Sequence, residues 1–128
     1  MKSVQVTINP TEIRSVKYLN NFNVKSGEKI SLKIQNEVGI KLNPASPLTA
    51  AVLIKCMVTD EESKCIEMEI ETITTVVTST FVDDLELYIK QNYMPVIMLA
   101  SNEKVRTLSA LMGTPIRLPN PGFGLNLN

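Results

Sequence analysis

The chain contains no histidine and no tryptophan. Without histidine, it has neither a Ser–His nor a Cys–His nucleophile pair, and it lacks the most common general base of enzymes. It has only two cysteines, Cys56 and Cys65, which are too few and too poorly spaced for a metal site without histidine to help. We therefore expect a protein that is not an enzyme and needs no metal or other cofactor.

Net charge and long apolar runs are also missing. The 13 basic and 13 acidic residues cancel, so there is no basic excess of the kind that nucleic-acid or anionic-membrane binders use. No apolar run approaches the ~20 residues of a membrane span. The N-terminal MKSVQVTINP has no apolar stretch typical of a signal peptide. We expect one domain, residues 1–128, in the cytoplasm, with no membrane insertion and no nucleic-acid partner.

Up to about residue 80, apolar and polar residues alternate with the period of a β-strand. Between residues 30 and 42 the apolar side chains stand on even positions, which predicts a strand, or a strand pair bent near Gly39, with one buried and one wet face. The segment 13–24 has an imperfect phase, as in an edge strand or a bulged strand. We predict strands over residues 4–8, 13–24, 30–42, 48–59 and 65–80.

The same alternation places the two cysteines. Cys56 falls in phase with the apolar residues of its strand, whereas Cys65 falls in phase with the glutamates of the next strand. A disulfide needs both sulfur atoms on one side of the sheet. We therefore predict two free thiols, as is usual in a reducing cytosol.

From residue 82 the apolar spacing becomes helical. Asp83, Asp84 and Glu86 put negative charge in the first turn, where it offsets the helix dipole. Pro95 predicts a break near residues 92–94 and a second helix that begins there, and Gly113 is the expected C-cap. The helices should therefore cover residues 82–112, followed by an extended tail over 113–128.

Between Pro95 and Leu118 the sequence resembles the SecB export-chaperone family, and the order of four strands followed by two helices matches that family as well. The resemblance is carried by Pro95 at the start of the long helix, by Gly113-Thr114 about a helix length later, and by the proline-containing segment 115–119. It implies an α+β fold in which a four-stranded antiparallel sheet is packed on one side by two C-terminal helices. It also implies a dimer of dimers that holds unfolded polypeptides in apolar grooves, without ATP or cofactor. Family members usually carry an aromatic-proline-tyrosine run where this chain has Leu99-Ala100-Ser101.

The acidic residues are clustered, since nine of the 13 fall within residues 60–86. Glu67, Glu69 and Glu71 share one face of their strand. One interpretation is a solvated face whose glutamates pair with lysines on neighbouring strands, namely Lys33, Lys41 and Lys55. The other is a docking patch for a basic partner, and the resemblance implies SecA as that partner. A catalytic carboxylate pair is disfavoured, because glutamates on a solvent face lack the burial that raises a pKa.

Apolar residues exceed what one sheet and two helices can bury. Val96 and Leu99 do not share the helix face of Ile97, and the outer face of the strand over residues 48–59 is only partly polar. Such residues need a second subunit or a client to cover them, which predicts a homo-oligomer, either a dimer or a tetramer. Methionine also adapts to varied apolar partners. The predicted client-binding or oligomer surface comprises Leu53, Met57, Tyr88, Tyr93, Met94, Val96, Met98 and Leu99.

Two functions remain open. The first is an ATP-independent holding chaperone that binds unfolded or precursor polypeptides, with protein export as the implied pathway. The second is an interaction module of the same fold that binds one dedicated protein, for example an antitoxin.

Overall fold

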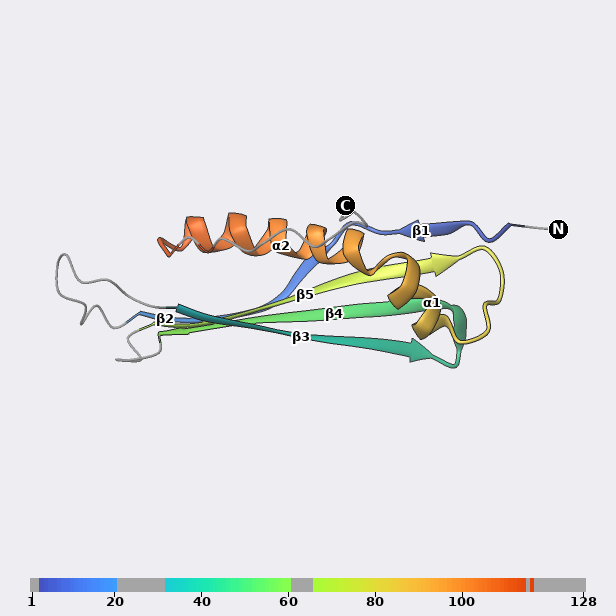
Figure 1. The fold of residues 1–128 in the computed structure, drawn as a ribbon, viewed down its shortest axis with the longest axis horizontal. Helices are drawn as coiled ribbons and strands as arrows, with labels where there is room; N and C mark the ends of the chain where they lie inside the picture. The colour runs from blue at the N-terminus through green and yellow to red at the C-terminus, as the bar shows by residue number, and fades with distance from the viewer. Residues whose placement is uncertain (1–2, 21–31, 61–65, 115, 117–128) are drawn as a thin grey trace.

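A computed structural model describes residues 3–20, 32–60, 66–114 and 116 of the chain. The described part is an α+β fold with the predicted order of strands followed by helices (Figure 1). The elements are β1 (Val6–Ile8), β2 (Glu12–Asn20), β3 (Leu32–Asn43), β4 (Ser46–Asp60), β5 (Ile66–Thr78), α1 (Leu85–Asn92) and α2 (Met94–Leu111).

The sheet is antiparallel throughout and has the order β1-β5-β4-β3, with β2 also paired to β5. β1 lies opposite residues 76–78 of β5, and β2 lies opposite residues 66–73 of the same strand. The five strands therefore occupy four positions across the sheet, which accounts for the four strands expected. The register shifts between Ile13 and Ser15, so the irregular second segment is a bulged edge strand, as predicted.

The central strands β4 and β5 alternate as their sequences predict. On β4, the even residues from Val52 to Val58 are all buried, and they face the helices. On β5, Met68, Ile70 and Val76 are buried on the same side. Cys56 is one of these buried residues and is a free thiol, whereas its counterpart in the prediction, Cys65, lies outside the described residues.

The helix α1 begins where the sequence places its acidic turn. The Asp84 side chain accepts a hydrogen bond from the Leu87 N–H at 3.2 Å and so caps the helix. Glu86 lies in the first turn and pairs with Lys90 at 3.0 Å, one turn later. The helix ends at Asn92, at the break that Pro95 predicts.

The helix α2 ends in a Schellman motif. Gly113 has a φ of 85°, a left-handed conformation that favours glycine. Its N–H donates to the Ala110 carbonyl at 3.1 Å, and the Thr114 N–H donates to the Ser109 carbonyl at 3.0 Å. The predicted C-cap is confirmed. The chain then turns back, and Ile116 is buried in the core beneath the helix.

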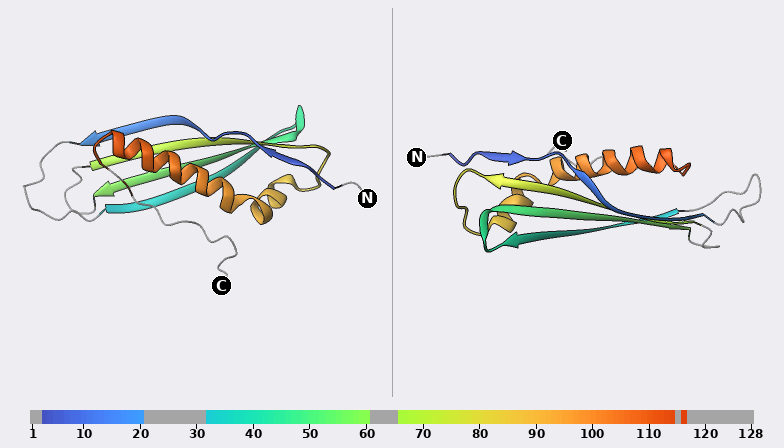
Figure 2. Two further views of the ribbon diagram at one scale, coloured as in Figure 1. Left: turned by 90° about the horizontal axis from the view of Figure 1, so that it is seen from above. Right: turned by 180° about the vertical axis from the view of Figure 1, so that it is seen from behind.

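The helices lie on one side of the sheet, with α2 crossing it diagonally (Figure 2). Leu85, Ile89 and Ile97 pack on one end of β4 and β5, and Val105 packs on the other end. α2 contacts β5 and β4, and β3 is left at the margin. The alternation predicted a buried apolar face on β3. That face is apolar, but no residue of β3 is buried.

Candidate binding surfaces

Four of the predicted client-binding residues pack against the core beside α1. Tyr88, Tyr93, Met94 and Met98 are half-buried against the cluster formed by Ile89, Ile97 and the neighbouring strand residues. The two tyrosine rings lie 5.9 Å apart, tilted by 57°. A hydrogen bond with Tyr88, together with burial, raises the pKa of Tyr93 above its ordinary value. These side chains lie at the junction of the two helices and present only part of their surface to solvent.

Val96 and Leu99 lie differently. α2 turns Ile97, Ser101 and Val105 inward, so Val96 points away from the sheet and is 47% exposed. Leu99 is half-buried on a flank of the helix. Asn102 lies one turn further along that flank. The structure therefore places these two residues outside the core face, as the spacing indicated.

A second set of apolar residues near α1 was not singled out from the sequence. Leu42, Phe81, Val82 and Leu85 line a hollow of about 300 Å³ between the β3–β4 turn and the start of α1. Leu42 is 50% exposed, and Phe81 is also exposed. Leu42 stands in phase with the apolar residues of its strand, but that phase does not reveal that the helices end short of it.

Hydroxyl pairs join α2 and the N-terminal segment to the buried side of β5. The Thr72 and Ser101 hydroxyl oxygens are 2.7 Å apart, and both side chains are fully buried. Thr11 and Thr74 form a second buried pair, also at 2.7 Å. Sequence reasoning missed all four residues. Two features of the sequence could have indicated that these residues are buried. Thr72 and Thr74 stand at even positions of β5, in phase with its apolar residues, and Ser101 lies one turn after Ile97.

The other side of the sheet, which we call the open face, carries Leu53 and Met57. Leu53 is only 8% exposed, although no helix covers this side, since Ile73 flanks it directly on β5. Met57 is half-buried and lines a hollow of about 400 Å³ together with Leu19 and Glu67. Of the two predicted residues, Met57 alone presents a sizeable surface here.

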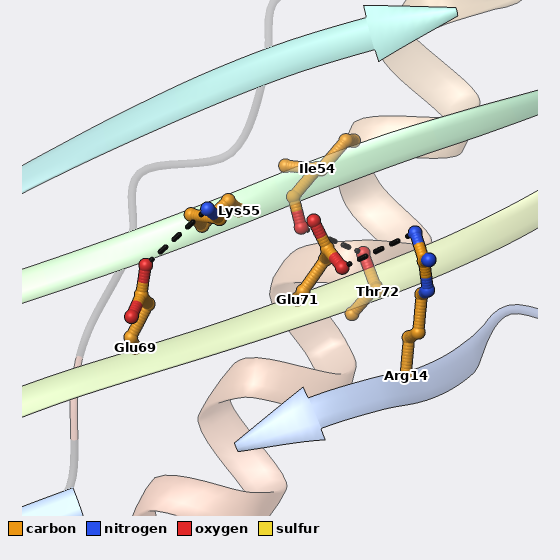
Figure 3. Close-up of polar contacts among 6 residues, drawn as sticks. All are labelled: Arg14, Ile54, Lys55, Glu69, Glu71 and Thr72. Carbon is orange, nitrogen blue, oxygen red and sulfur yellow. Dashed lines mark hydrogen bonds and ion pairs between the residues drawn. The ribbon is translucent and has the colours of Figure 1, made fainter. Parts of the chain in front are cut away.

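The glutamates of β5 lie on this open face, as predicted (Figure 3). The Glu69 carboxylate forms ion pairs with Lys55 Nζ at 3.4 Å and with Lys17 Nζ at 3.7 Å. The Glu71 carboxylate forms one with the Arg14 guanidinium at 3.5 Å. Lys55 is thus one of the expected partners.

The other two expected partners, Lys33 and Lys41, stand on β3, and β4 separates that strand from β5. Residues of β2 take their place, because β2 is the strand that lies beside the glutamates.

The open face is therefore close to neutral. Over the described strands it carries five carboxylates and five cationic side chains. They are Glu12, Glu37, Glu67, Glu69 and Glu71, with Arg14, Lys17, Lys33, Lys41 and Lys55. On the described strands, the cationic side chains therefore offset the charge of the glutamates. A basic partner that docked here would meet both signs of charge.

Two further findings concern the described residues as a whole. No helix among them is long and apolar enough to cross a membrane. Within the same ranges, no three histidine, cysteine, aspartate or glutamate side chains gather as they would around a metal ion.

No family model matches the chain, and no curated protein matches it in sequence. Its structure is similar to that of Mycobacterium tuberculosis Rv1957, a SecB-like chaperone solved in complex with a ChAD peptide from the Rv1956 HigA1 antitoxin. The TM-score is 0.70 at 15% sequence identity, over 89% of each chain. The chain therefore has a SecB-like α+β fold.

Proposed function

We propose that this protein binds extended polypeptides on the helix side of its sheet and acts as an ATP-independent holding chaperone. The observation that carries the proposal is the apolar surface left uncovered there. Val96 on α2 and Val38 and Leu42 on β3 are all more than 40% exposed. Val38 and Leu42 belong to one apolar face of β3 that no described helix covers, and a continuous exposed apolar face is typical of an interaction site.

The chemistry of such a site is binding alone. An unfolded client offers apolar side chains and unpaired backbone groups. The site offers half-buried methionine and tyrosine, and an edge of β3 with which no other described strand pairs. Apolar contacts and backbone pairing give affinity without sequence specificity. We propose no enzymatic activity and no cofactor.

A dedicated polypeptide partner is the second candidate function. It is supported by the structure of Rv1957, which was solved with a peptide from an antitoxin. The same apolar surface would then hold one specific segment. The two candidates differ in the range of chains that compete for the site.

Assembly into a dimer or tetramer also belongs to the proposal. Among the described strands, none pairs with the outer edge of β2, and Ile13 and Val16 are exposed on the helix side of that strand. Docking of SecA on Glu67, Glu69 and Glu71 stays a prediction, as do protein export and a cytoplasmic location. The ion pairs of Glu69 and Glu71 weigh against a docking site based on charge alone.

The test is a titration against one chemically unfolded polypeptide, with its native form as control, on protein of known mass in solution. We expect only the unfolded form to bind, and Val96→Asp to weaken that binding at least tenfold. Thr107→Asp is the matched control, because Thr107 is exposed and polar on the same helix. Equal binding of the two variants, or no binding of any unfolded chain, would contradict the holding function. Binding of a single sequence and no other would favour the dedicated partner.

A further inference from the structure

The outer edge of β3 pairs with no other strand among the described residues. On its other side the strand pairs with β4 without a register shift from Leu32 to Leu42. The backbone N–H and C=O groups along a regular edge of this kind can pair with a further strand. A strand that adds here must also match the side chains that β3 carries on its two faces.

Two charged side chains on β3 form no ion pair within the described residues. They are Glu37 and Lys41, both exposed on the open face. Lys55 lies opposite Glu37 on β4, but its ammonium group pairs with Glu69. Charges on an edge strand commonly keep other strands away. Here the two charges have opposite signs and stand one beyond the other along the strand, so they can attract a strand that carries the same charges in reverse order.

We propose that a second copy of this chain pairs with β3 through its own β3, antiparallel, about a two-fold axis at Gly39. The axis reverses the order of residues, so each Glu37 lies opposite the partner's Lys41, and the interface holds two opposite-charge pairs. On the helix side, each Val38 lies opposite the partner's Ile40. The two Gly39 residues meet at the axis, and no atom lies within 4 Å of the place that a Cβ would take there. The long charged side chains on either side therefore have room to reach each other.

One other two-fold register of the described β3 residues brings unlike charges together. Its centre is Gln35, and it sets Lys33 opposite the partner's Glu37. In that register Leu42, which is 50% exposed, lies beyond the described part of the partner's strand. The register at Gly39 keeps Leu42 within the paired segment and so covers more of the exposed apolar surface. We therefore assign the centre to Gly39.

This pairing builds the client surface from two copies. The two-fold axis runs normal to the sheet, so the helix sides of both copies face the same way. The apolar faces of the two β3 strands, each with its exposed Val38 and Leu42, then form one continuous surface. This consequence rests on the proposed function, because it describes the same surface. A client that paired its backbone with β3 would first have to displace the second copy.

The experiment measures the mass of the full chain in solution over a range of concentrations, and it needs no client. A strand-edge contact buries less than the roughly 1,600 Å² of a standard interface, so we expect a dissociation constant in the micromolar range. Glu37→Lys and Lys41→Glu each turn both pairs into like-charge pairs, and each should raise that constant at least tenfold. Both side chains are exposed, so both variants should keep the fold, which circular dichroism checks.

Mixing the two variants separates pairing between copies from effects within one chain. A mixed dimer regains two opposite-charge pairs, so an equimolar mixture should associate within about twofold of the unsubstituted chain. Lys33→Glu is the matched control, because Lys33 is exposed on the same face of the same strand and lies outside the two pairs. All variants keep the β2 edge, so assembly through β2 contributes equally to each mass.

A disulfide between two copies locates the axis. Residues directly opposite each other in an antiparallel pair have Cα atoms about 4.5–5.5 Å apart, within the range that a disulfide spans. In a Cys65→Ser background, Gly39→Cys should therefore link two chains when oxidised glutathione is added. Gln35→Cys should not, because its two copies lie about 27 Å apart along the strands.

The outcomes separate this inference from the holding function. Equal association of every variant would overturn the inference, as would a mixture that stays dissociated or a disulfide that forms at Gln35 in place of Gly39. Restored association of the mixture, without client binding by any of the proteins, would support it and would refute the holding function instead.

Discussion

Removing the buried hydroxyl of Ser101 tests how the helix layer is fixed to the sheet. Ser101→Ala deletes the 2.7 Å contact with Thr72 and leaves Thr72 Oγ1 with only a long donor contact of 3.4 Å to the Ile54 carbonyl. Thr72 is 1% exposed, so water cannot replace the lost partner. A buried hydroxyl without a good partner costs about 1–3 kcal/mol. We expect a loss of about 2 kcal/mol in the free energy of unfolding.

Removing the other hydroxyl of the pair, that of Thr72, should cost a different amount of unfolding free energy. Thr72→Val keeps the shape of the side chain and removes its hydroxyl, which leaves Ser101 to bond within its own helix, to a carbonyl one turn earlier. We expect a smaller loss, of about 1 kcal/mol. In the double variant both polar groups are gone, and such a replacement can be nearly neutral. The sum of the two single losses should therefore exceed the loss in the double variant by up to about 3 kcal/mol.

Urea unfolding followed by far-ultraviolet circular dichroism measures these values, because the chain has no tryptophan. All variants are compared at one protein concentration, since an oligomer changes its apparent stability with concentration. Thr107→Ala serves as the control at an exposed position of α2. A double variant whose loss equals the sum of the single losses within about 0.5 kcal/mol would refute the reasoning, because uncoupled sites are additive to that extent.

Three further predictions concern single positions. Leu99→Asp should weaken client binding or assembly at least tenfold, about 1.4 kcal/mol, while circular dichroism shows the sheet still folded; unchanged mass and unchanged affinity would contradict this. Gly113→Ala should cost about 1 kcal/mol in urea unfolding, because its φ is 85° and no atom lies within 4 Å of the added methyl group, so only backbone strain acts. Burial raises the pKa of the Cys56 thiol from 9.0 to about 11, so the native state keeps a proton that the unfolded state loses, and stability should fall as pH rises from 9 to 11. In Cys56→Ala that part of the pH slope should disappear; an identical slope in both proteins would show that the thiol is not responsible.

Much of the fold could be predicted because its signals are local. The alternation of β4 and β5 fixes which side chains face the core, and Pro95 and Gly113 mark the bounds of α2 through their own backbone preferences. The partners of Glu69 and Glu71 could not be predicted fully, since they depend on which strands are neighbours. Alternation says nothing of that order.

The surfaces could be predicted only in part for the same reason. An apolar phase on β3 shows that one face avoids water, and it does not show whether a helix reaches that face. Leu53 presents the opposite case, because strand neighbours bury it on a side that no helix covers. The hydroxyl pairs were missed because a buried threonine or serine becomes recognisable only beside its partner, and Thr72 and Ser101 are 29 residues apart.

The two sides of the sheet should differ in how their binding responds to salt, and this separates the candidate functions. The open face is charge-balanced, and Glu69 is already shared between Lys17 and Lys55, so a partner there must compete with existing ion pairs. The helix side offers Val38, Leu42 and Val96, which carry no charge. Raising the ionic strength from about 0.1 M to about 1 M shortens the Debye length from about 10 Å to about 3 Å, which weakens contacts between exposed charges and spares apolar burial. We therefore expect the affinity for an unfolded polypeptide that carries both charged and apolar residues to change less than about twofold over this range, and Glu69→Gln to leave it unchanged. A steep loss of affinity with salt that Glu69→Gln abolishes would move the binding site to the open face and favour a single charged partner.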